Sequence, residues 1–347
     1  MTNWKTHPSF DAHEEVVSVG DEALGFAGLI AVHSTALGPA AGGCRIWSYE
    51  RDEDALTDAL RLSRGMTYKN AMADLPLGGG KAVIYRMGPD RAACFGKFGE
   101  QVEALNGRYV TAEDVGASVA DMRAIARRTA YVAGLPNEEG QAGGDPSPMT
   151  ALGVFVSIEA LLGGSMRGRT IAVQGVGAVG FKLCQLLAAA GAKLVIADVN
   201  KANLVRAEPL GAEIAPVDQI HAVKADLFSP CALGAGLNEH TIAELGAPFV
   251  CGAANNQLAT GEDGARLLLR GITYAPDYVV NAGGIINVSA EYLGEPAEVV
   301  EARVRAIAPR VMGVLETAER DAIPPHEAAD RIVRERLAAA KKLSLAS

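Results

Sequence analysis

Along the opening third of the chain, stretches of apolar residues at helical spacing alternate with short apolar runs typical of strands. Apolar positions recur at helical spacing over 55–66 and again over 95–105, where the pattern stops at Gly107. Short apolar runs at 82–85 and 108–111 predict strands beside these helices. The first third is therefore expected to form an α/β unit.

The pattern lapses between 132 and 147, where Gly, Pro, Asn and Asp dominate, as is typical of a linker. Beyond it a helix is predicted from about Thr150, and a strand, helix and strand follow as one βαβ unit at 170–174, 178–190 and 193–198. Further strands are predicted at 226–228, 249–251 and 272–274. Their spacing leaves room for crossovers, so a doubly wound parallel sheet is expected.

These patterns predict three parts of an α/β protein with two domains around a cleft. They are a substrate-binding and catalytic domain at 1–135, a Rossmann domain at 145–295, and C-terminal helices at 296–347 that pack back on the first domain. The length of 347 residues agrees, because it exceeds what one hydrophobic core usually organises.

Charge and composition narrow the partners. The net charge of -9 disfavours nucleic acid and anionic membranes, and no segment looks like a leader or a membrane span. The five cysteines lie far apart without a C-x-x-C pair, which favours reduced thiols in the cytoplasm. The six histidines lack metal-ligand spacing, so no metal is expected. A small molecule remains as the expected ligand.

A glycine fingerprint stands between a predicted strand and helix. Its members are Gly175, Gly177, Ala178, Val179 and Gly180. In this context Gly175 permits a tight turn, Gly177 lets backbone amides approach a pyrophosphate, and Gly180 allows close packing. Asp198 ends the next strand, where a carboxylate accepts ribose hydroxyls and repels a 2′-phosphate, so NAD is the expected cofactor. The alternatives are FAD, which usually binds nearer the start of a chain, or glycines that only make a turn.

Two lysines and an aspartate are candidates for catalysis in the first domain. Lys69 is expected just after a helix, and Lys81 follows three glycines that let backbone and ligand meet closely. If the two amines converge, repulsion and desolvation would lower the pKa of one and make it a general base. Asp114 follows a strand. The alternatives are two solvated lysines and an aspartate that caps a helix.

Several stretches carry a resemblance to a known family. They are GPAAGGCRIW, LRLSRGMTYKNAMADLPLGGGKAVI, LNGRYVTAEDVG, SPMTALGV, VQGVGAVG, CGAANNQL and YAPDYVVNAGGIINV. In register over 31–293, they resemble the branched-chain and aromatic branch of the glutamate dehydrogenase superfamily, the leucine dehydrogenases above all and then the phenylalanine and tryptophan dehydrogenases.

The resemblance implies roles for individual residues. Lys69 matches the lysine that binds the substrate carboxylate, Lys81 the catalytic lysine that activates water, and Asp114 the aspartate that handles the amino group and its protons. Thr150 and Asn256 look like the contacts that orient nicotinamide and substrate. Members close a cleft on their substrate and assemble as homo-oligomers, so a homo-oligomer from dimer to octamer is expected.

The positions that match the family's side-chain pocket are apolar or lack a side chain. They are Ala41, Gly42, Ala112, Ile285 and Val288. A charged substrate side chain would be unpaired there, so NAD-dependent deamination of an apolar L-amino acid, leucine or another branched-chain one, to a 2-oxo acid and ammonia is expected. Ala112 agrees with leucine enzymes, whereas Ala41 is smaller than their leucine and broadens the range, unless it only packs a loop.

The sequence alone is also compatible with other substrates and with a non-catalytic role. Phenylalanine or tryptophan is the alternative substrate, and a non-catalytic NAD-binding sensor is a remote alternative that would have little use for Lys69, Lys81 and Asp114 together. A 2-hydroxy-acid dehydrogenase would need a histidine as its acid and base, and no histidine here lies in a matching motif.

Overall fold

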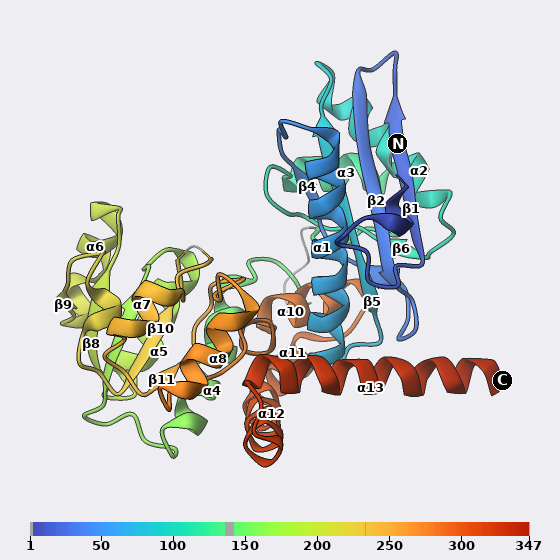
Figure 1. The fold of residues 1–347 in the computed structure, drawn as a ribbon. Coiled ribbons are helices and arrows are strands. Elements are labelled where there is room, and N and C mark those ends of the chain that lie inside the picture. The colour runs from blue at the N-terminus through green and yellow to red at the C-terminus, as the bar shows by residue number, and fades with distance from the viewer. Residues whose placement is uncertain (1–2, 136–141, 233, 347) are drawn as a thin grey trace. The chain divides into compact units, whose positions relative to one another are not determined.

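The computed structural model describes residues 3–135, 142–232 and 234–346, and their course is drawn in Figure 1. The chain divides into two compact units. The first unit comprises Met1–Gly144, Asn287–Ala297 and Val333–Ser347, and the second comprises Asp145–Ile286 and Glu298–Ile332. The chain first passes from one unit to the other between Gly144 and Asp145, inside the expected linker. Residues 136–141 of that linker lie outside the described residues.

The first unit is built on a mixed sheet in the order β1-β2-β5-β3-β6, with β4 also paired to β5. β1 and β2 form an antiparallel hairpin, β2 and β5 are antiparallel, and the remaining pairs are parallel. The strands are β1 (Glu15–Asp21), β2 (Phe26–Ser34), β3 (Ala40–Ala41), β4 (Cys44–Ile46), β5 (Gly78–Arg86) and β6 (Tyr109–Val110). The expected α/β class is confirmed, although the first four strands are additions to the predicted elements.

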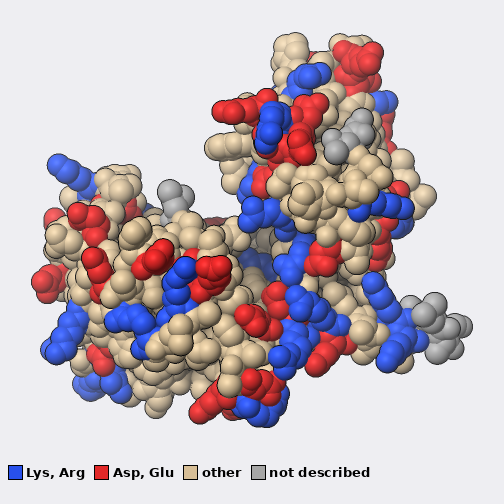
Figure 2. Space-filling view, viewed as in Figure 1, with Lys and Arg blue, Asp and Glu red and all other residues tan. Residues whose placement is uncertain are grey.

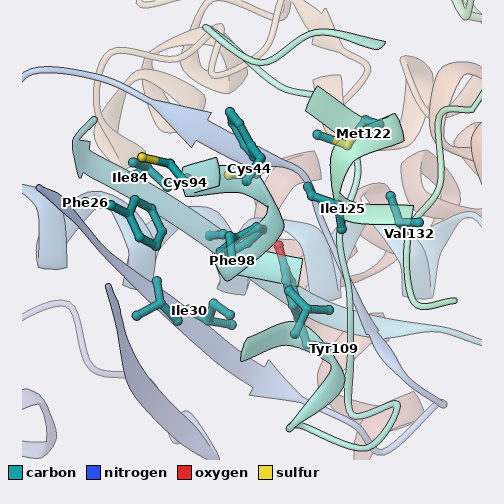
Figure 3. Packing of buried hydrophobic residues seen from close by; sticks show 14 of the residues in the cluster. Phe26, Ile30, Cys44, Ile84, Cys94, Phe98, Tyr109, Met122, Ile125 and Val132 are labelled. Carbon is teal, nitrogen blue, oxygen red and sulfur yellow. The ribbon is translucent and has the colours of Figure 1, made fainter. Parts of the chain in front are cut away.

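Helices cover both faces of this sheet. They are α1 (Asp52–Met72), α2 (Arg91–Glu103) and α3 (Val119–Ala126). Side chains alternate along β2, so Leu29 packs with α1 on one face, whereas Phe26 and Ile30 point to the opposite face. There Phe98 of α2 and Ile125 of α3 complete the main core, shown in Figure 3.

The glycine run Gly78, Gly79 and Gly80 is buried and belongs to β5, so the strand begins earlier than the predicted 82–85. A Cβ on Gly79 would overlap the backbone of Thr67 in α1, and one on Gly80 would lie 2.6 Å from the Tyr109 ring. Gly79 therefore lets α1 lie directly on the strand, and Gly80 leaves room for the Tyr109 ring on the opposite face.

The second unit holds a fully parallel sheet in the order β12-β11-β10-β7-β8-β9. Its strands are β7 (Thr170–Gln174), β8 (Lys193–Ala197), β9 (Glu213–Ile214), β10 (Leu227–Pro230), β11 (Phe249–Val250) and β12 (Thr273–Tyr274). Its main crossover helices are α5 (Ala178–Ala189), α6 (Lys201–Ala207), α7 (Glu239–Glu244) and α8 (Gly261–Leu269), with α4 (Ser147–Leu161) leading in. The predicted strands agree closely, and only β9 is an addition. Strand order reverses between β7 and β10, the switch point where doubly wound sheets bind ligands.

The C-terminal helices do not follow the expected division. They are α9 (Asp277–Val280), α10 (Gly283–Tyr292), α11 (Ala297–Arg305), α12 (Ile307–Asp321) and α13 (Pro325–Ala346). Residues 287–295 group with the first unit and 298–332 with the second, so only the end of the tail packs on the first unit as expected. The physical reason is that α12 buries Val311 and Val314 and packs on α4, whereas Arg336 donates to the carbonyl of Ala71 in α1 at 2.6 Å.

None of the described helices combines the length and the apolar character that a membrane span requires. On the face drawn in Figure 2, acidic and basic side chains are mixed over each unit.

The contact between α1 and β5 leads to a first prediction. Gly79→Ala should lower the free energy of unfolding by more than about 3 kcal/mol, because the methyl group meets backbone that cannot move aside. Gly65→Ala is the matched control, because no atom lies within 4 Å of its Cβ position in α1, and it should raise stability by about 0.5–1 kcal/mol. Urea unfolding measures both, and equal effects of the two variants would contradict this account.

Candidate active site

Lys81 is held as firmly as a core residue. It is the fourth residue of β5, pairs with Ala31 of β2, and is only 6% exposed. Strand alternation puts its side chain on the same face as Gly79 and Val83, the face that α1 covers. The amine forms an ion pair with Oδ2 of Asp114. Lys81 is therefore not a solvated surface lysine.

Asp114 reaches this lysine because the chain after β6 continues beside the chain after β3. The Gly42 amide donates to the carbonyl of Val110 at 3.1 Å, and the Cys44 amide donates to the carbonyl of Ala112 at 2.8 Å. A Cβ on Gly43 would come within 2.8 Å of the Asp114 Cβ, so a glycine is needed at this approach. The nearby helix α3 takes Ser118 as its N-cap, so Asp114 does not cap it.

Burial and the neighbouring groups shift the pKa of the Asp114 carboxyl in opposite directions. Burial would raise the pKa of its carboxyl, but the charge and hydrogen bond of Lys81, the Val115 amide and the charge of Arg45 together hold that pKa below its usual value. Its side chain is 19% exposed, and Arg45 Nε lies 3.6 Å from Oδ2. Asp114 is therefore an ionised carboxylate in its pair with Lys81.

Lys69 lies within the last turn of α1, which continues to Met72, and this corrects its expected place after a helix. The end of α1 is fixed by Asn70, whose Nδ2 donates to the Gly78 carbonyl at 2.6 Å. Met66, one turn earlier, comes within 3.1 Å of the Cβ position of Gly42. Residues three apart share a helix face, so Lys69 lies on the same face of α1 as Met66, the face directed toward Gly42. The meeting of the two lysine amines stays a prediction.

Three of the expected pocket positions lie on the segments that carry or adjoin this pair. Ala41 is buried and pairs with Gly79 and Val110, on either side of β3. Gly42 accepts a hydrogen bond from the Tyr109 hydroxyl at 2.6 Å, and Ala112 lies two residues before Asp114. The first unit thus places small apolar residues next to the Lys81 and Asp114 ion pair.

The two other pocket positions lie on α10. Ile285 and Val288 are half-buried and three residues apart, so they share one face of that helix. In the first unit, Glu291 accepts the amides of Gly134 and Leu135 at 3.1 and 2.8 Å, and this fixes the end of α10. A common pocket of all five positions stays a prediction.

The glycine fingerprint of the second unit has a geometry that suits each expected role. Gly175 has φ +90°, a left-handed conformation that glycine adopts at no cost. Gly177 is the N-cap of α5 and has no atom within 4 Å of its Cβ position, whereas a Cβ on Gly180 would overlap the Gly175 carbonyl. Ala178 and Val179 form the first turn of α5. The loop is open where a phosphate would approach and closed where the helix meets the strand.

Asp198 follows β8 and braces this loop. Its Oδ2 accepts the Val176 amide at 2.8 Å and the Asn203 amide group at 3.1 Å, and its Oδ1 accepts the Asn200 amide at 2.7 Å. A carboxylate accepts about four hydrogen bonds, so these three donors leave capacity for a ligand hydroxyl.

Arg206 is a residue of this region that sequence reasoning missed. Its Nη2 donates to the carbonyls of Val176 and Gly177 at 2.7 and 3.1 Å, and its guanidinium stacks on the Phe181 ring at 4.2 Å. It lies three residues after Asn203 on the same face of α6. Arg206 binds the loop directly, and Asn203 binds Asp198, which in turn accepts the Val176 amide. The spacing within α6 is the one signal the sequence offered.

Thr150 and Asn256 both lie in the second unit. Thr150 is in α4, and its hydroxyl lies 2.8 Å from the Cβ position of Gly284. Asn256 has φ +51°, which asparagine tolerates, and its carbonyl accepts the Ala235 amide at 2.7 Å.

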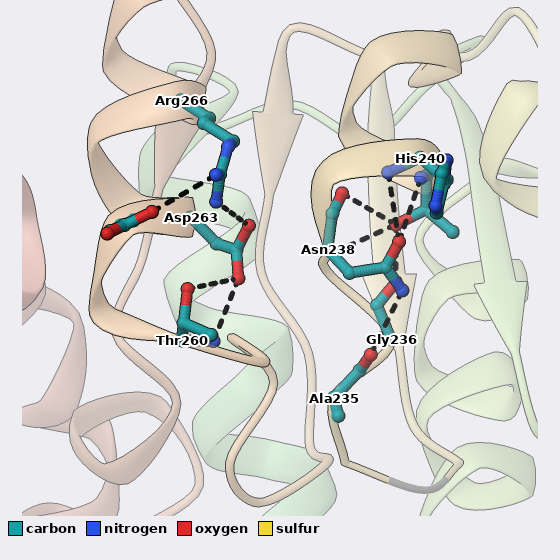
Figure 4. Close-up of polar contacts among 9 residues, drawn as sticks. Ala235, Gly236, Asn238, His240, Thr260, Asp263 and Arg266 are labelled. Carbon is teal, nitrogen blue, oxygen red and sulfur yellow. Dashed lines mark hydrogen bonds and ion pairs between the residues drawn. The ribbon is translucent and has the colours of Figure 1, made fainter.

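Two helix caps, drawn in Figure 4, fix the segments that precede and follow Asn256 in the sequence. Asn238 caps α7 by accepting the amides of His240 and Thr241 at 3.1 and 3.2 Å. Thr260 and Asp263 form a capping box at the start of α8.

Comparison with known proteins finds relatives over nearly the whole chain. Residues 13–131 match the family model for the Glu/Leu/Phe/Val dehydrogenase dimerisation domain, and residues 197–344 match the Glutamate/Leucine/Phenylalanine/Valine dehydrogenase model. The leucine dehydrogenase of Thermoactinomyces intermedius is 47% identical over 340 residues, which are 95% of this chain and 92% of that protein. The valine dehydrogenase of Streptomyces albus is 44% identical, over 96% of this chain and 95% of that protein.

The fold also matches a solved structure. The L-tryptophan dehydrogenase of Nostoc punctiforme superposes with a TM-score of 0.86 and 38% identity, over 95% of this chain and 97% of that one.

Proposed function

Because the chain belongs to the glutamate, leucine, phenylalanine and valine dehydrogenase family, we propose that it catalyses the reversible, NAD-dependent oxidative deamination of an apolar L-amino acid. The products are a 2-oxo acid and ammonia, and a branched-chain amino acid such as leucine is the preferred substrate. The buried ion pair of Lys81 and Asp114 beside Ala41 and Ala112 carries this proposal. It combines groups that move protons with a wall that has no charge for a polar substrate side chain.

Each residue of the first unit has a distinct task in this proposal. Lys69 binds the substrate carboxylate as a point charge and so fixes Cα. A bound nicotinamide would supply the acceptor for the hydride of Cα, and the substrate would become an iminium. Lys81, as a neutral amine, takes a proton from the water that attacks Cα, and a carbinolamine results. Asp114, as a carboxylate, first takes a proton from the amino group of the substrate and later returns it to the carbinolamine nitrogen, so that ammonia leaves.

The ion pair sets the pH at which each direction runs. Lys81 must lose its proton before it can act as a base, whereas its ammonium form is the acid that reductive amination requires. Deamination is therefore favoured at alkaline pH and amination at lower pH.

The residues of the second unit suit a dinucleotide. The open Gly177 stands at the N-terminus of α5, where backbone amides and the helix dipole favour a pyrophosphate. Asp198 would accept a ribose hydroxyl with its remaining acceptor site and would repel a 2′-phosphate. Thr150 and Asn256 would orient the nicotinamide.

Two features favour a second candidate substrate class. Ala41 is a small residue in the proposed pocket, and the structure of a tryptophan dehydrogenase resembles this one closely. An aromatic amino acid, phenylalanine or tryptophan, is therefore the alternative substrate.

Assembly and location complete the proposal. The first unit matches a model described as a dimerisation domain, which supports a homo-oligomer from dimer to octamer. The enzyme would act in the cytoplasm, where its five cysteines would stay reduced.

Lys81→Ala should abolish turnover, because no other group occupies its place beside Asp114 in the proposed mechanism. NAD affinity should stay near the wild-type value, since the fingerprint lies in the other unit. Steady-state kinetics and calorimetric NAD titration measure the two effects, with Lys97→Ala on α2 as the control. Retention of more than about a tenth of the wild-type rate would remove Lys81 as the base.

Asp198 should make NAD the preferred cofactor. The catalytic efficiency with NADP should be lower by at least about tenfold in the wild type, and Asp198→Ala should narrow the difference mainly by weakening NAD. Comparable efficiencies with both cofactors in the wild-type enzyme would contradict the assignment.

The substrate class is tested with a panel of amino acids that includes leucine, valine, phenylalanine, tryptophan and glutamate. NADH formation should be most efficient with apolar amino acids. Ala41→Leu should raise the ratio of leucine to phenylalanine efficiency, because methylene-scale changes in an apolar pocket are worth about 1–3 kcal/mol.

The exposed Ala104→Leu serves as the control for this variant. An unchanged ratio in Ala41→Leu would mean that Ala41 only packs a loop. Glutamate as the best substrate would overturn the apolar pocket itself.

A further inference from the structure

Arg45 of β4 lies between two carboxylates of the first unit. Its Nη1 pairs with Oδ2 of Asp58 in α1 at 2.9 Å, and its Nε lies 3.6 Å from Oδ2 of Asp114. Only a quarter of its side chain is exposed. One guanidinium therefore links the long helix α1 to the proposed catalytic carboxylate.

The anchor of Arg45 is itself well held. The Tyr49 hydroxyl donates to the same Oδ2 of Asp58 at 2.5 Å. Burial and the neighbouring Asp58 raise the pKa of the Tyr49 phenol, so it remains a donor. Asp58 is thus held by two donors and anchors the Nη1 end of the guanidinium.

The Nε atom of Arg45 faces Asp114 and not the carboxylate of Asp58 that binds Nη1. Within the part of the chain that the structure describes, this buried atom makes no hydrogen bond, and it faces Asp114. The Asp58 pair alone does not explain this orientation, because that pair uses Nη1. The Nε edge places a permanent positive charge beside the oxygen that also binds Lys81.

We propose that Arg45 is a positioning residue of the catalytic pair, which keeps Asp114 ionised and in place while Lys81 gives up its proton. The inference rests on the proposed function. When Lys81 becomes neutral, a mostly buried carboxylate would be left without its counter-charge, which is costly. Arg45 supplies that charge and therefore eases the release of the proton from Lys81.

The other groups around the pair do not offer this charge in the same way. Burial raises the pKa of the Cys44 thiol on β4 and of the Tyr109 phenol on β6, so both stay neutral. Arg91 of α2 is bound by two hydrogen bonds to Asp121 of α3. The remaining charged groups are Glu113, which precedes Asp114 in the sequence, Asp58, which binds Arg45, and Lys69 of α1, whose approach to the pair stays a prediction.

The test compares pH profiles of deamination. In Arg45→Met the acidic limb of kcat/KM should move to higher pH by about one unit, which is about a tenfold lower rate at a fixed pH on that limb. Arg45→Lys keeps a charge that can reach one carboxylate at a time, so its limb should move less. Arg91→Met is the matched control, because it removes another guanidinium paired with a carboxylate, and it should leave the limb in place.

A second measurement does not depend on activity. Trace labelling with acetic anhydride, followed by mass spectrometry of the peptide that contains Lys81, reports the fraction of neutral amine at each pH. The midpoint of labelling should rise by about one pH unit in Arg45→Met, as the kinetic limb does. If no amino acid is oxidised by the wild type, the proposed function fails, whereas a shifted midpoint still supports the coupling of Arg45 to Lys81.

Equal midpoints in the wild type and Arg45→Met would overturn the inference, even if the variant melts at a lower temperature or has a higher KM. If Arg45→Met does not fold, Arg45→Gln provides the same comparison, because it also removes the positive charge beside Asp114. An unchanged midpoint in Arg45→Gln would then reject the role of Arg45.

Discussion

Gly79 has no side chain, and for this reason α1 can lie directly against β5 with Thr67 at the closest point. The contact fixes two segments that are distant in the sequence. The end of α1, which carries Lys69, is held on the strand that carries Lys81, and Asn70 ties the two together through Gly78. Both lysines owe their positions to backbone packing, since a larger residue in the glycine run would separate the helix from the strand.

The second constraint on the site is electrostatic. A buried ion pair contributes little net stability, because removing both charges from water costs about as much as their attraction returns. The pair of Lys81 and Asp114 therefore adds little to the stability of the fold, and in the proposed function it serves the chemistry. Gly43 allows Asp114 to approach, and the Nε of Arg45 lies 3.6 Å from the same carboxylate.

The sequence predicted local features well and long-range ones poorly. The βαβ unit around Gly175 agrees almost residue for residue, because strand, turn and helix signals there are all local. The glycine run before Lys81 was placed outside the strand, since glycine is a poor strand former and the helix packed against it is not visible locally. Arg45 and Arg206 were missed because their partners lie on other elements. The tail helices showed an apolar face, and a period alone does not indicate which unit buries it.

The burial of Lys81 has a consequence for entropy. A lysine side chain in water samples many rotamers, and confining it to one costs about 2 kcal/mol. Here the strand fixes the backbone, and the cover of α1 together with the ion pair restricts the four-carbon stem when the chain folds. That loss of freedom is complete before any substrate arrives. In the proposed mechanism each catalytic cycle would begin with the amine already ordered, so that no binding energy is needed to order it.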